Sequence, residues 1–253
     1  MANRLANKVA VVTGGSRGIG ASFAEALAAE GAAVVIADVM DGTATADRIA
    51  AAGGTAGFIR TDVTSEAEVA ALFADTERRF GPVDALVNNA ALFADLDKKP
   101  FTEIDAGEWD KVMAVNVRGP FLCARAAAPA MTRRGSGKIV NIASGTVFKG
   151  IVGMLHYVTS KGAVVAMTRC LARELGPQGI CVNAIAPGLT MSEAVAASPT
   201  WQDASSQATV NSRAIRRDQL PQDLTGALVF LCSGDSDFMT GQTLVVDGGS
   251  VTH

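Results

Sequence analysis

A regular alternation between two kinds of segment constrains the fold of this chain more than any other feature. Short β-branched and apolar runs are typical of strands buried on both faces of a sheet, and longer alanine-rich stretches follow them at helical period. The predicted strands are Val9–Thr13, Ala33–Ala37, Gly57–Arg60, Ala85–Asn88, Lys138–Ile142, Ile180–Ile185 and Thr243–Val246. The clearest predicted helices are Ile19–Glu30, Glu66–Phe80, Trp109–Met131 and Tyr157–Leu175. The alternation predicts βαβ units, and therefore a doubly wound α/β fold with one seven-stranded parallel sheet and helices on both faces.

The segment Gly188–Asp223 is the longest stretch without a predicted strand. We expect a helical excursion over a binding site, because long loops in compact domains are usually lids or binding segments. A mobile surface insertion is the alternative. No linker composition interrupts the chain, so we expect residues 1–253 to form a single domain.

Composition and charge argue against several classes of function. The formal net charge is −3 and no basic stripe recurs along a helix, which argues against nucleic-acid binding. Four scattered cysteines and two histidines suggest neither a disulfide framework nor a metal site. No apolar run reaches the roughly 20 residues of a membrane span, and the first residues do not resemble a signal peptide. We therefore expect a cytoplasmic protein with no metal, nucleic-acid or membrane partner.

A glycine-rich loop, TGGSRGIG, joins the first predicted strand to the first predicted helix. Gly14 permits the tight turn, while Gly18 and Gly20 leave room for a phosphate and for close packing of the helix. Ser16, Arg17 and Ile19 complete the loop, and the helix that follows presents free N–H groups to an anion. A strand before the loop and a helix after it are the context of a dinucleotide site, so the doubly wound fold is expected to be a Rossmann domain.

Asp38, just after the second predicted strand, indicates which dinucleotide is preferred. A carboxylate there can accept a hydrogen bond from a ribose 2′-hydroxyl and would repel a 2′-phosphate. The next residue, Val39, offers a phosphate no contact. Arg17 argues the other way, but the repulsion from Asp38 would act at closer range. The expected cofactor is therefore NAD.

Tyr157 and Lys161 lie four residues apart at the start of a predicted helix, and therefore on one face of it. A neighbouring ammonium favours the phenolate and is expected to lower the pKa of Tyr157, so that this residue can exchange a proton with a hydroxyl or carbonyl. Ser144 ends the fifth predicted strand, where its hydroxyl could hydrogen-bond a substrate oxygen. His156 is expected to face elsewhere, as a packing or rim residue.

Together these motifs resemble the short-chain dehydrogenase/reductase family from Leu5 to His253. Further motifs that carry the resemblance are Asp62-Val63, Asn88-Asn89-Ala90, Asn116 and Pro187-Gly188, all in family order. The resemblance implies that Tyr157 is the general acid/base, that Lys161 binds the nicotinamide ribose, and that Ser144 orients the carbonyl. It also implies that Asn116 holds a water in a proton relay linked to Lys161.

The resemblance further implies how the rest of the cofactor is held. Asp62 and Val63 would frame the adenine, Asn89 and Ala90 would pass under the cofactor, and Pro187, Gly188 and Thr190 would contact its nicotinamide side. Where the family usually has glycine after this Asn-Asn-Ala, the chain has Ala91, whose methyl group could narrow the pocket. The resemblance implies a homotetramer.

The expected activity is hydride transfer between NAD(H) and a small, apolar secondary alcohol or ketone, or an aldehyde, as in alcohol dehydrogenases of the 1-phenylethanol dehydrogenase type. Three loops should form the substrate pocket, with the apolar side chains Leu92, Phe93, Val147, Phe148, Leu155, Met191 and Trp201. Lys149 could bind a carboxylate or phosphate, although a solvated loop lysine is more common. The alternatives are an NADPH-dependent 3-oxoacyl-ACP reductase-type ketoreductase, with Arg133-Arg134 as a docking patch, and a non-catalytic scaffold.

Overall fold

A single seven-stranded parallel sheet organises the chain in the computed structural model, which describes residues 3–201 and 204–252. The strands are β1 (Val9–Thr13), β2 (Ala33–Asp38), β3 (Thr55–Arg60), β4 (Ala85–Asn88), β5 (Gly137–Ile142), β6 (Ile180–Pro187) and β7 (Thr243–Val246). Their order across the sheet is β3-β2-β1-β4-β5-β6-β7, and every neighbouring pair is parallel. The direction of winding reverses between β1 and β4, which creates a crevice at their carboxyl ends. The predicted fold class and all seven predicted strands are confirmed.

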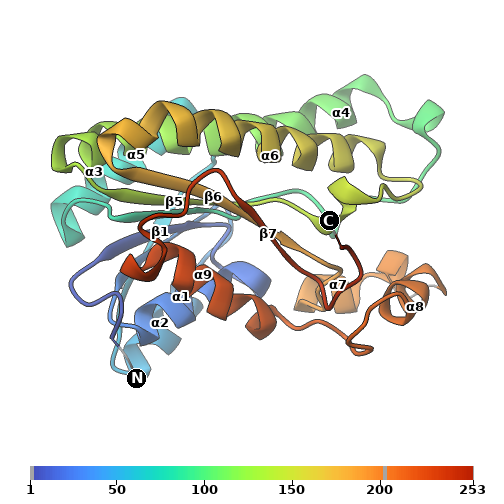
Figure 1. Cartoon of the computed structure of the whole chain (residues 1–253), viewed down its shortest axis with the longest axis horizontal. Coiled ribbons are helices and arrows are strands. Elements are labelled where there is room, and N and C mark those ends of the chain that lie inside the picture. The colour runs from blue at the N-terminus through green and yellow to red at the C-terminus, as the bar shows by residue number, and fades with distance from the viewer. Residues whose placement is uncertain (1–2, 202–203, 253) are drawn as a thin grey trace.

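Helices cover both faces of the sheet (Figure 1). One layer contains α1 (Gly18–Ala29), α2 (Thr43–Ala51) and α9 (Thr225–Cys232), and the other contains α3 (Glu66–Phe80), α5 (Gly119–Arg134) and α6 (Leu155–Leu175). Each layer encloses its own apolar core against the sheet, with Val12 and Phe23 at the centre of one core and Val11 and Leu72 at the centre of the other. Successive strand residues such as Val11 and Val12 point to opposite faces, which is why nearly continuous apolar runs are needed.

The predicted helix Trp109–Met131 is interrupted. The structure has α4 (Ala106–Met113), one π-helical turn over Ala114–Arg118, and then α5. A π turn inserts an extra residue and changes the direction in which the following side chains point, and such turns are frequent at functional sites. Asn116 lies in this turn and is fully buried. Apolar periodicity on both sides of the turn is preserved, so the pattern alone did not reveal it.

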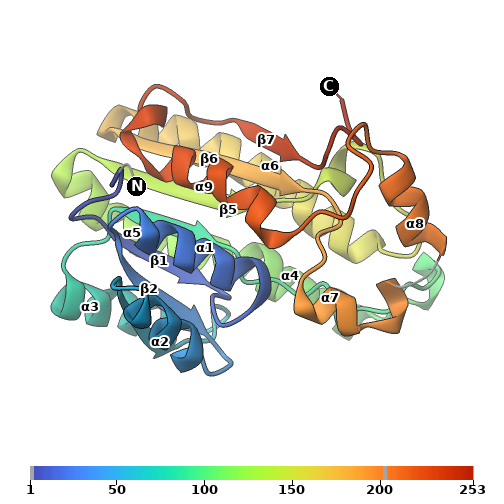
Figure 2. The ribbon, with the colours of Figure 1, turned by 90° about the horizontal axis from the view of Figure 1, so that it is seen from below.

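Beyond the carboxyl ends of the strands lies the excursion that the sequence predicted over residues 188–223 (Figure 2). It contains the short helices α7 (Glu193–Ala197) and α8 (Ala204–Asn211). Its base is held by a parallel bridge between Thr190 and Gln219, by a 2.7 Å hydrogen bond from the Met191 amide to the Gln219 carbonyl, and by a 2.6 Å bond from Gln219 Nε2 to the Val246 carbonyl. The excursion is therefore anchored to the sheet at β7.

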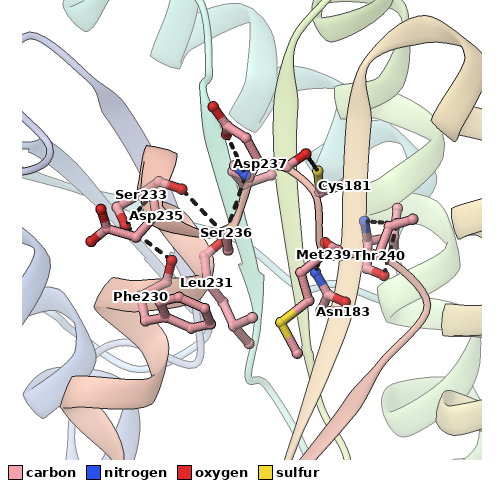
Figure 3. A network of polar contacts seen from close by, with 12 residues as sticks. Cys181, Asn183, Phe230, Leu231, Ser233, Asp235, Ser236, Asp237, Met239 and Thr240 are labelled. Atoms are coloured by element: carbon pink, nitrogen blue, oxygen red, sulfur yellow. Dashed lines mark hydrogen bonds and ion pairs between the residues drawn. The ribbon is translucent and has the colours of Figure 1, made fainter.

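The last strand is held in place by the turn that precedes it (Figure 3). Asn183 Nδ2 donates to the Met239 carbonyl at 2.7 Å, and the Val182 amide donates to Thr240 Oγ1 at 3.0 Å. Ser236 Oγ caps the end of α9 by bonding the Leu231 and Ser233 carbonyls. These contacts fix β7 beside β6, and so bring the residues after β7 to the carboxyl edge of the sheet.

A buried polar ladder crosses the centre of the sheet to reach α6. Asn88 Nδ2 donates to Asn141 Oδ1 on the neighbouring strand at 2.9 Å, and Asn141 Nδ2 donates to Thr168 Oγ1 on α6 at 2.9 Å. Thr168 Oγ1 in turn donates to the Val164 carbonyl within the helix. Because α6 carries Tyr157, this ladder fixes the helix that holds the candidate acid/base.

Replacing Asn141 with alanine is expected to destabilise the fold by about 1–3 kcal/mol, because both ladder bonds are lost and buried polar groups on Asn88 and Thr168 lose a partner. Urea unfolding would measure the change. The matched control is Asn211→Ala on exposed α8, expected within about 0.5 kcal/mol of the parent. Equal effects of the two substitutions would contradict a structural role for the ladder.

Candidate active site

The glycine loop leaves the start of α1 open to an anion. Gly14 and Gly18 adopt φ values of +63° and +57°, which glycine reaches without strain. Arg17, at the N-cap position, makes no side-chain hydrogen bond to the helix. In contrast, Ser65 and Asp105 accept hydrogen bonds from the first turns of α3 and α4. The uncapped N–H groups of α1 therefore fit a pyrophosphate.

The segment after β4 clamps this loop. Asn89 Nδ2 donates to the carbonyls of Thr13 and Gly14 at 3.0 and 2.9 Å, while Thr13 Oγ1 accepts from the amides of Asn89 and Ala90. A Cβ atom on Gly20 would lie 2.0 Å from the Gly14 carbonyl oxygen, so the helix and the loop pack too closely for any side chain there. This clamp places Asn89 and Ala90 against the floor of the crevice.

One cavity of 1190 Å³ extends from the glycine loop to α8. Of the residues predicted to bind the cofactor or act in catalysis, those that line it are Gly14, Arg17, Gly18, Ile19, Gly20, Asp38, Asp62, Val63, Asn89, Ala90, Ser144, Tyr157, Lys161, Pro187, Gly188 and Thr190. Ser16 and Asn116 lie behind its wall and act on lining residues instead. Ala91, where the family usually has glycine, also lines the cavity.

Asp38 is held firmly at the end of β2. Its Oδ2 accepts hydrogen bonds from Ser16 Oγ at 2.6 Å and from the Ser16 amide at 3.0 Å, and its Oδ1 accepts from the Met40 amide at 3.1 Å. The two residues that follow, Val39 and Met40, are exposed and apolar, so neither offers a cation to a 2′-phosphate.

Tyr157 and Lys161 lie on the face of α6 that turns into the cavity, and both are almost completely buried. Lys161 Nζ donates a 2.7 Å hydrogen bond to the Ile142 carbonyl at the end of β5. The same nitrogen lies 5.9 Å from the centre of the Tyr157 ring. The expected pairing on one helix face is therefore present.

The acid–base properties of this pair differ from the sequence expectation. Burial raises the pKa of Tyr157 to about 12, and a hydrogen bond with the Ser144 hydroxyl opposes this shift. Burial lowers the pKa of Lys161 to about 8. Desolvation disfavours the charged form of both groups and outweighs the expected effect of the ammonium on the phenol. The prediction of a lowered pKa for Tyr157 is thus wrong.

Ser144 and Asn116 are connected to Tyr157 in different ways. Ser144 lies just past the end of β5 and lines the cavity, where its Oγ accepts a 2.9 Å hydrogen bond from Thr146. The Asn116 amide bonds both main-chain polar groups of Leu92 and donates to Ser160 Oγ at 3.1 Å. Ser160 Oγ donates onward to the Tyr157 carbonyl. The Asn116 side chain therefore connects the loop after β4 to α6, and Ser160, which no sequence signal singled out, completes the link.

An aromatic stack covers the substrate side of the cavity. The Phe93 ring centre lies 4.8 Å from that of Tyr157 and 4.4 Å from that of Trp201, so three segments meet over the acid/base residue. Leu92, Phe93 and Trp201 line the cavity as predicted. Of the other predicted pocket residues, Val147 and Phe148 do not line the cavity but pack against a core that includes Val164 and Ala184, and Leu155 is exposed. Met191 packs behind the wall beside Trp201 and Val195.

A second polar link near the site was not foreseen. His156, fully buried, bonds Glu108 on α4 through Nε2 at 3.1 Å, and Glu108 pairs with Lys99 at 2.7 Å. His156 is a packing residue, as predicted, but it also joins α6 to α4 and to the substrate loop. Only a tertiary contact shows this, because the three residues are far apart in the sequence.

Comparison with known proteins identifies the family that shares this fold and site. A family profile described as enoyl-(acyl carrier protein) reductase matches residues 14–251. Galactitol 2-dehydrogenase of Agrobacterium fabrum is 40% identical over 256 residues, which cover 98% of each chain. The chain belongs to the short-chain dehydrogenase/reductase family. Members of this family are named dehydrogenases and reductases and bind nicotinamide cofactors, so this chain is an oxidoreductase.

Two further relatives match the short-chain dehydrogenase/reductase chain along its whole length. Cis-4-hydroxycyclohexanecarboxylate dehydrogenase of Sinomonas cyclohexanicum is 39% identical and covers 98% of each chain. A solved structure from Beutenbergia cavernae, assigned as an NAD(P)-dependent gluconate 5-dehydrogenase with NADP bound, has a TM-score of 0.91 at 35% identity and covers 99% of each chain. Within residues 3–201 and 204–252, no helix has the length and apolar character required to cross a membrane.

The lowered pKa of Lys161 predicts a specific pH dependence of stability. Between about pH 8 and 10.5 the unfolded chain binds a proton that the folded chain has released, so stability rises with pH. We expect the free energy of unfolding of the parent, minus that of Lys161→Met, to be about 2 kcal/mol larger at pH 9.5 than at pH 7. Urea unfolding of both proteins at each pH measures this difference. A difference that stays constant with pH would show that Lys161 titrates normally.

Proposed function

We propose that the protein is an NAD(H)-dependent dehydrogenase that interconverts a small secondary alcohol and its ketone. The observation that carries the cofactor preference is the position of Asp38, fixed by Ser16 on the wall of the cavity where the adenosine ribose would lie. The apolar wall formed by Phe93, Trp201 and Val195 supports a substrate with an apolar body. The names of the relatives support a secondary alcohol, since galactitol 2-dehydrogenase and the hydroxycyclohexanecarboxylate dehydrogenase are named for such groups.

In this proposal a bound nicotinamide would supply the acceptor for the hydride of the alcohol carbon, and the glycine loop and the segment after β4 would hold the cofactor. Tyr157 Oη takes the hydroxyl proton in the oxidation and returns it in the reduction. Burial raises the pKa of this phenol to about 12, so a positive charge placed beside it is needed to favour the phenolate. Lys161 supplies such a charge below its pKa of about 8, and Ser144 donates a hydrogen bond to the substrate oxygen.

A second candidate is an NADPH-dependent ketoreductase of the 3-oxoacyl-(acyl carrier protein) type. The description of the matching family profile and the exposed cation of Arg17 in the glycine loop favour it. The carboxylate of Asp38 disfavours it, because a 2′-phosphate would meet a negative charge. The relative affinities for NADH and NADPH distinguish the two candidate functions.

Three further parts of the proposal rest on the sequence: the lack of linker composition for the first, the family resemblance for the second, and the composition for the third. We infer that residues 1–253 act as one domain, that the enzyme assembles as a homotetramer, and that it works in the cytoplasm. Size-exclusion chromatography with light scattering tests the tetramer.

NADH should bind the purified protein at least tenfold more tightly than NADPH, as measured by titration of nicotinamide fluorescence. Asp38→Ala should reduce or reverse this ratio, because it removes both the ribose acceptor and the repulsion of the 2′-phosphate. Asp41→Ala is the matched control, since this exposed carboxylate bonds only its neighbour Thr43. Tighter binding of NADPH by the parent would overturn the NAD assignment and favour the ketoreductase.

Tyr157→Phe should lower kcat for oxidation of secondary alcohols by at least about a hundredfold while leaving NADH affinity within a few-fold of the parent. The phenylalanine keeps the ring that packs on Phe93, so the stack is preserved. Steady-state kinetics and the same fluorescence titration provide the two readouts. Unchanged turnover would remove Tyr157 from the chemistry.

A further inference from the structure

Arg213 presents an unusual electrostatic situation at the substrate end of the cavity. This residue lies just after the end of α8. It is 3% exposed and lines the cavity. A guanidinium is always charged, and moving that charge out of water is strongly unfavourable unless an opposite charge compensates it. Among residues 3–201 and 204–252, however, no carboxylate lies within ion-pair distance of it.

The contacts that Arg213 makes are to main-chain oxygens. Its two terminal nitrogens donate to the carbonyls of Arg217 and Leu189 at 2.6 and 2.7 Å, while its Nε has no acceptor among the described residues. Asp223 lies near enough to interact with the charge of Arg213, but its carboxylate is already paired with Arg217. Its two oxygens are bound by Arg217 at 2.6 and 2.7 Å, and one of them also accepts the Leu220 amide.

A second cation lies at the same corner. Lys149 follows Ser144 by five residues, lines the cavity and donates a 2.8 Å hydrogen bond to Ser250 Oγ. Ser250 follows Gly248, and a Cβ on that glycine would lie 3.3 Å from the Arg213 side chain. The turn after β7 therefore lies between Lys149 and Arg213. We name these two cations the basic corner.

The basic corner adjoins the catalytic residues. A Cβ on Gly145, directly after Ser144, would lie 3.5 Å from Asp247 Oδ2 on the turn that reaches Arg213. Asp247 is the acid on this turn, and its Oδ1 is held by the amides of Gly249 and Ser250. Elsewhere on the cavity wall, Lys98 Nζ lies 4.6 Å from the centre of the Trp201 ring.

Arg213, Lys149 and the aromatic stack together fit a ligand that has an apolar part and an anionic part. The stack of Phe93 and Trp201 fits an apolar body, and the basic corner fits an anion. We propose that the substrate carries a carboxylate in addition to the hydroxyl that is oxidised, and that Arg213 and Lys149 bind it. The enzyme is then a hydroxy-acid dehydrogenase in which the carboxylate orients the alcohol carbon toward Tyr157. This inference rests on the proposed function and narrows its substrate class.

Binding without turnover provides the first test. The NADH-bound enzyme is titrated by calorimetry with cyclohexanecarboxylate and with its neutral isostere, cyclohexanecarboxamide. The carboxylate should bind at least tenfold more tightly, and its advantage should fall at least fivefold in Lys149→Met and in Arg213→Gln. Arg216→Gln, which changes an exposed arginine outside the cavity, should leave the advantage unchanged. Equal binding of the two ligands by the parent overturns the proposal.

Turnover provides the second test. The kcat/KM for 4-hydroxycyclohexanecarboxylate is compared with that for its methyl ester, using NAD. The acid should be preferred, and Lys149→Met should lower kcat/KM for the acid while leaving that for the ester within twofold. Arg213 also donates a hydrogen bond to the Leu189 carbonyl, so loss of activity on both substrates in Arg213→Gln would indicate that the loop around Leu189 has moved. Lys149→Met tests the effect of the positive charge without this complication.

The two proposals fail in different ways. Turnover of neutral alcohols with NAD, without any preference for the acid, would overturn the carboxylate site and leave the proposed function intact. Failure of NADH to bind would instead overturn the proposed function.

Discussion

The clamp between Asn89 and the glycine loop is the contact on which the whole site depends. It joins the ends of β1 and β4, the two strands between which the winding of the sheet reverses. Two side-chain bonds to the main chain of Thr13 and Gly14 keep the loop open toward the cavity and leave the start of α1 uncapped. Because Gly20 then packs against the Gly14 carbonyl, the cofactor side of the cavity has little freedom to rearrange.

The substrate side is built differently. Its walls come from the loop after β4, the turn after β5, the excursion before α9 and the turn after β7. Side-chain contacts join these segments: Asn116 and Ser160 connect the first to α6, and Phe93 stacks between Tyr157 and Trp201. A scaffold of one shape can in this way carry different substrate walls, which is why the family resemblance identifies the chemistry but not the substrate.

The parts that the sequence predicted well are those with strong local signals. Buried parallel strands need apolar residues on both faces, so Val9–Thr13 and the other runs were recognisable. The glycine loop and the pair Tyr157 and Lys161 have fixed spacings that follow from local geometry. The π turn at Ala114–Arg118 left the apolar period intact and was missed. The pKa values of Tyr157 and Lys161 depend on how much water the fold excludes, and no spacing encodes that. The spacing of the sequence likewise did not show that Val147 and Phe148 pack into a core instead of lining the cavity.

The position of β7 has a consequence for how the enzyme is made. Asp247 and Ser250 follow the last strand, yet they form part of the cavity wall beside Ser144. Chains emerge from the ribosome at about 5–20 residues per second and begin to fold from the N-terminal side. Because domains generally fold as units, the substrate wall cannot be complete until β7 has been synthesised. The last residues to leave the ribosome therefore decide when the reaction site closes, since the edge strand beside β6 carries Asp247 and Ser250 to the cavity wall.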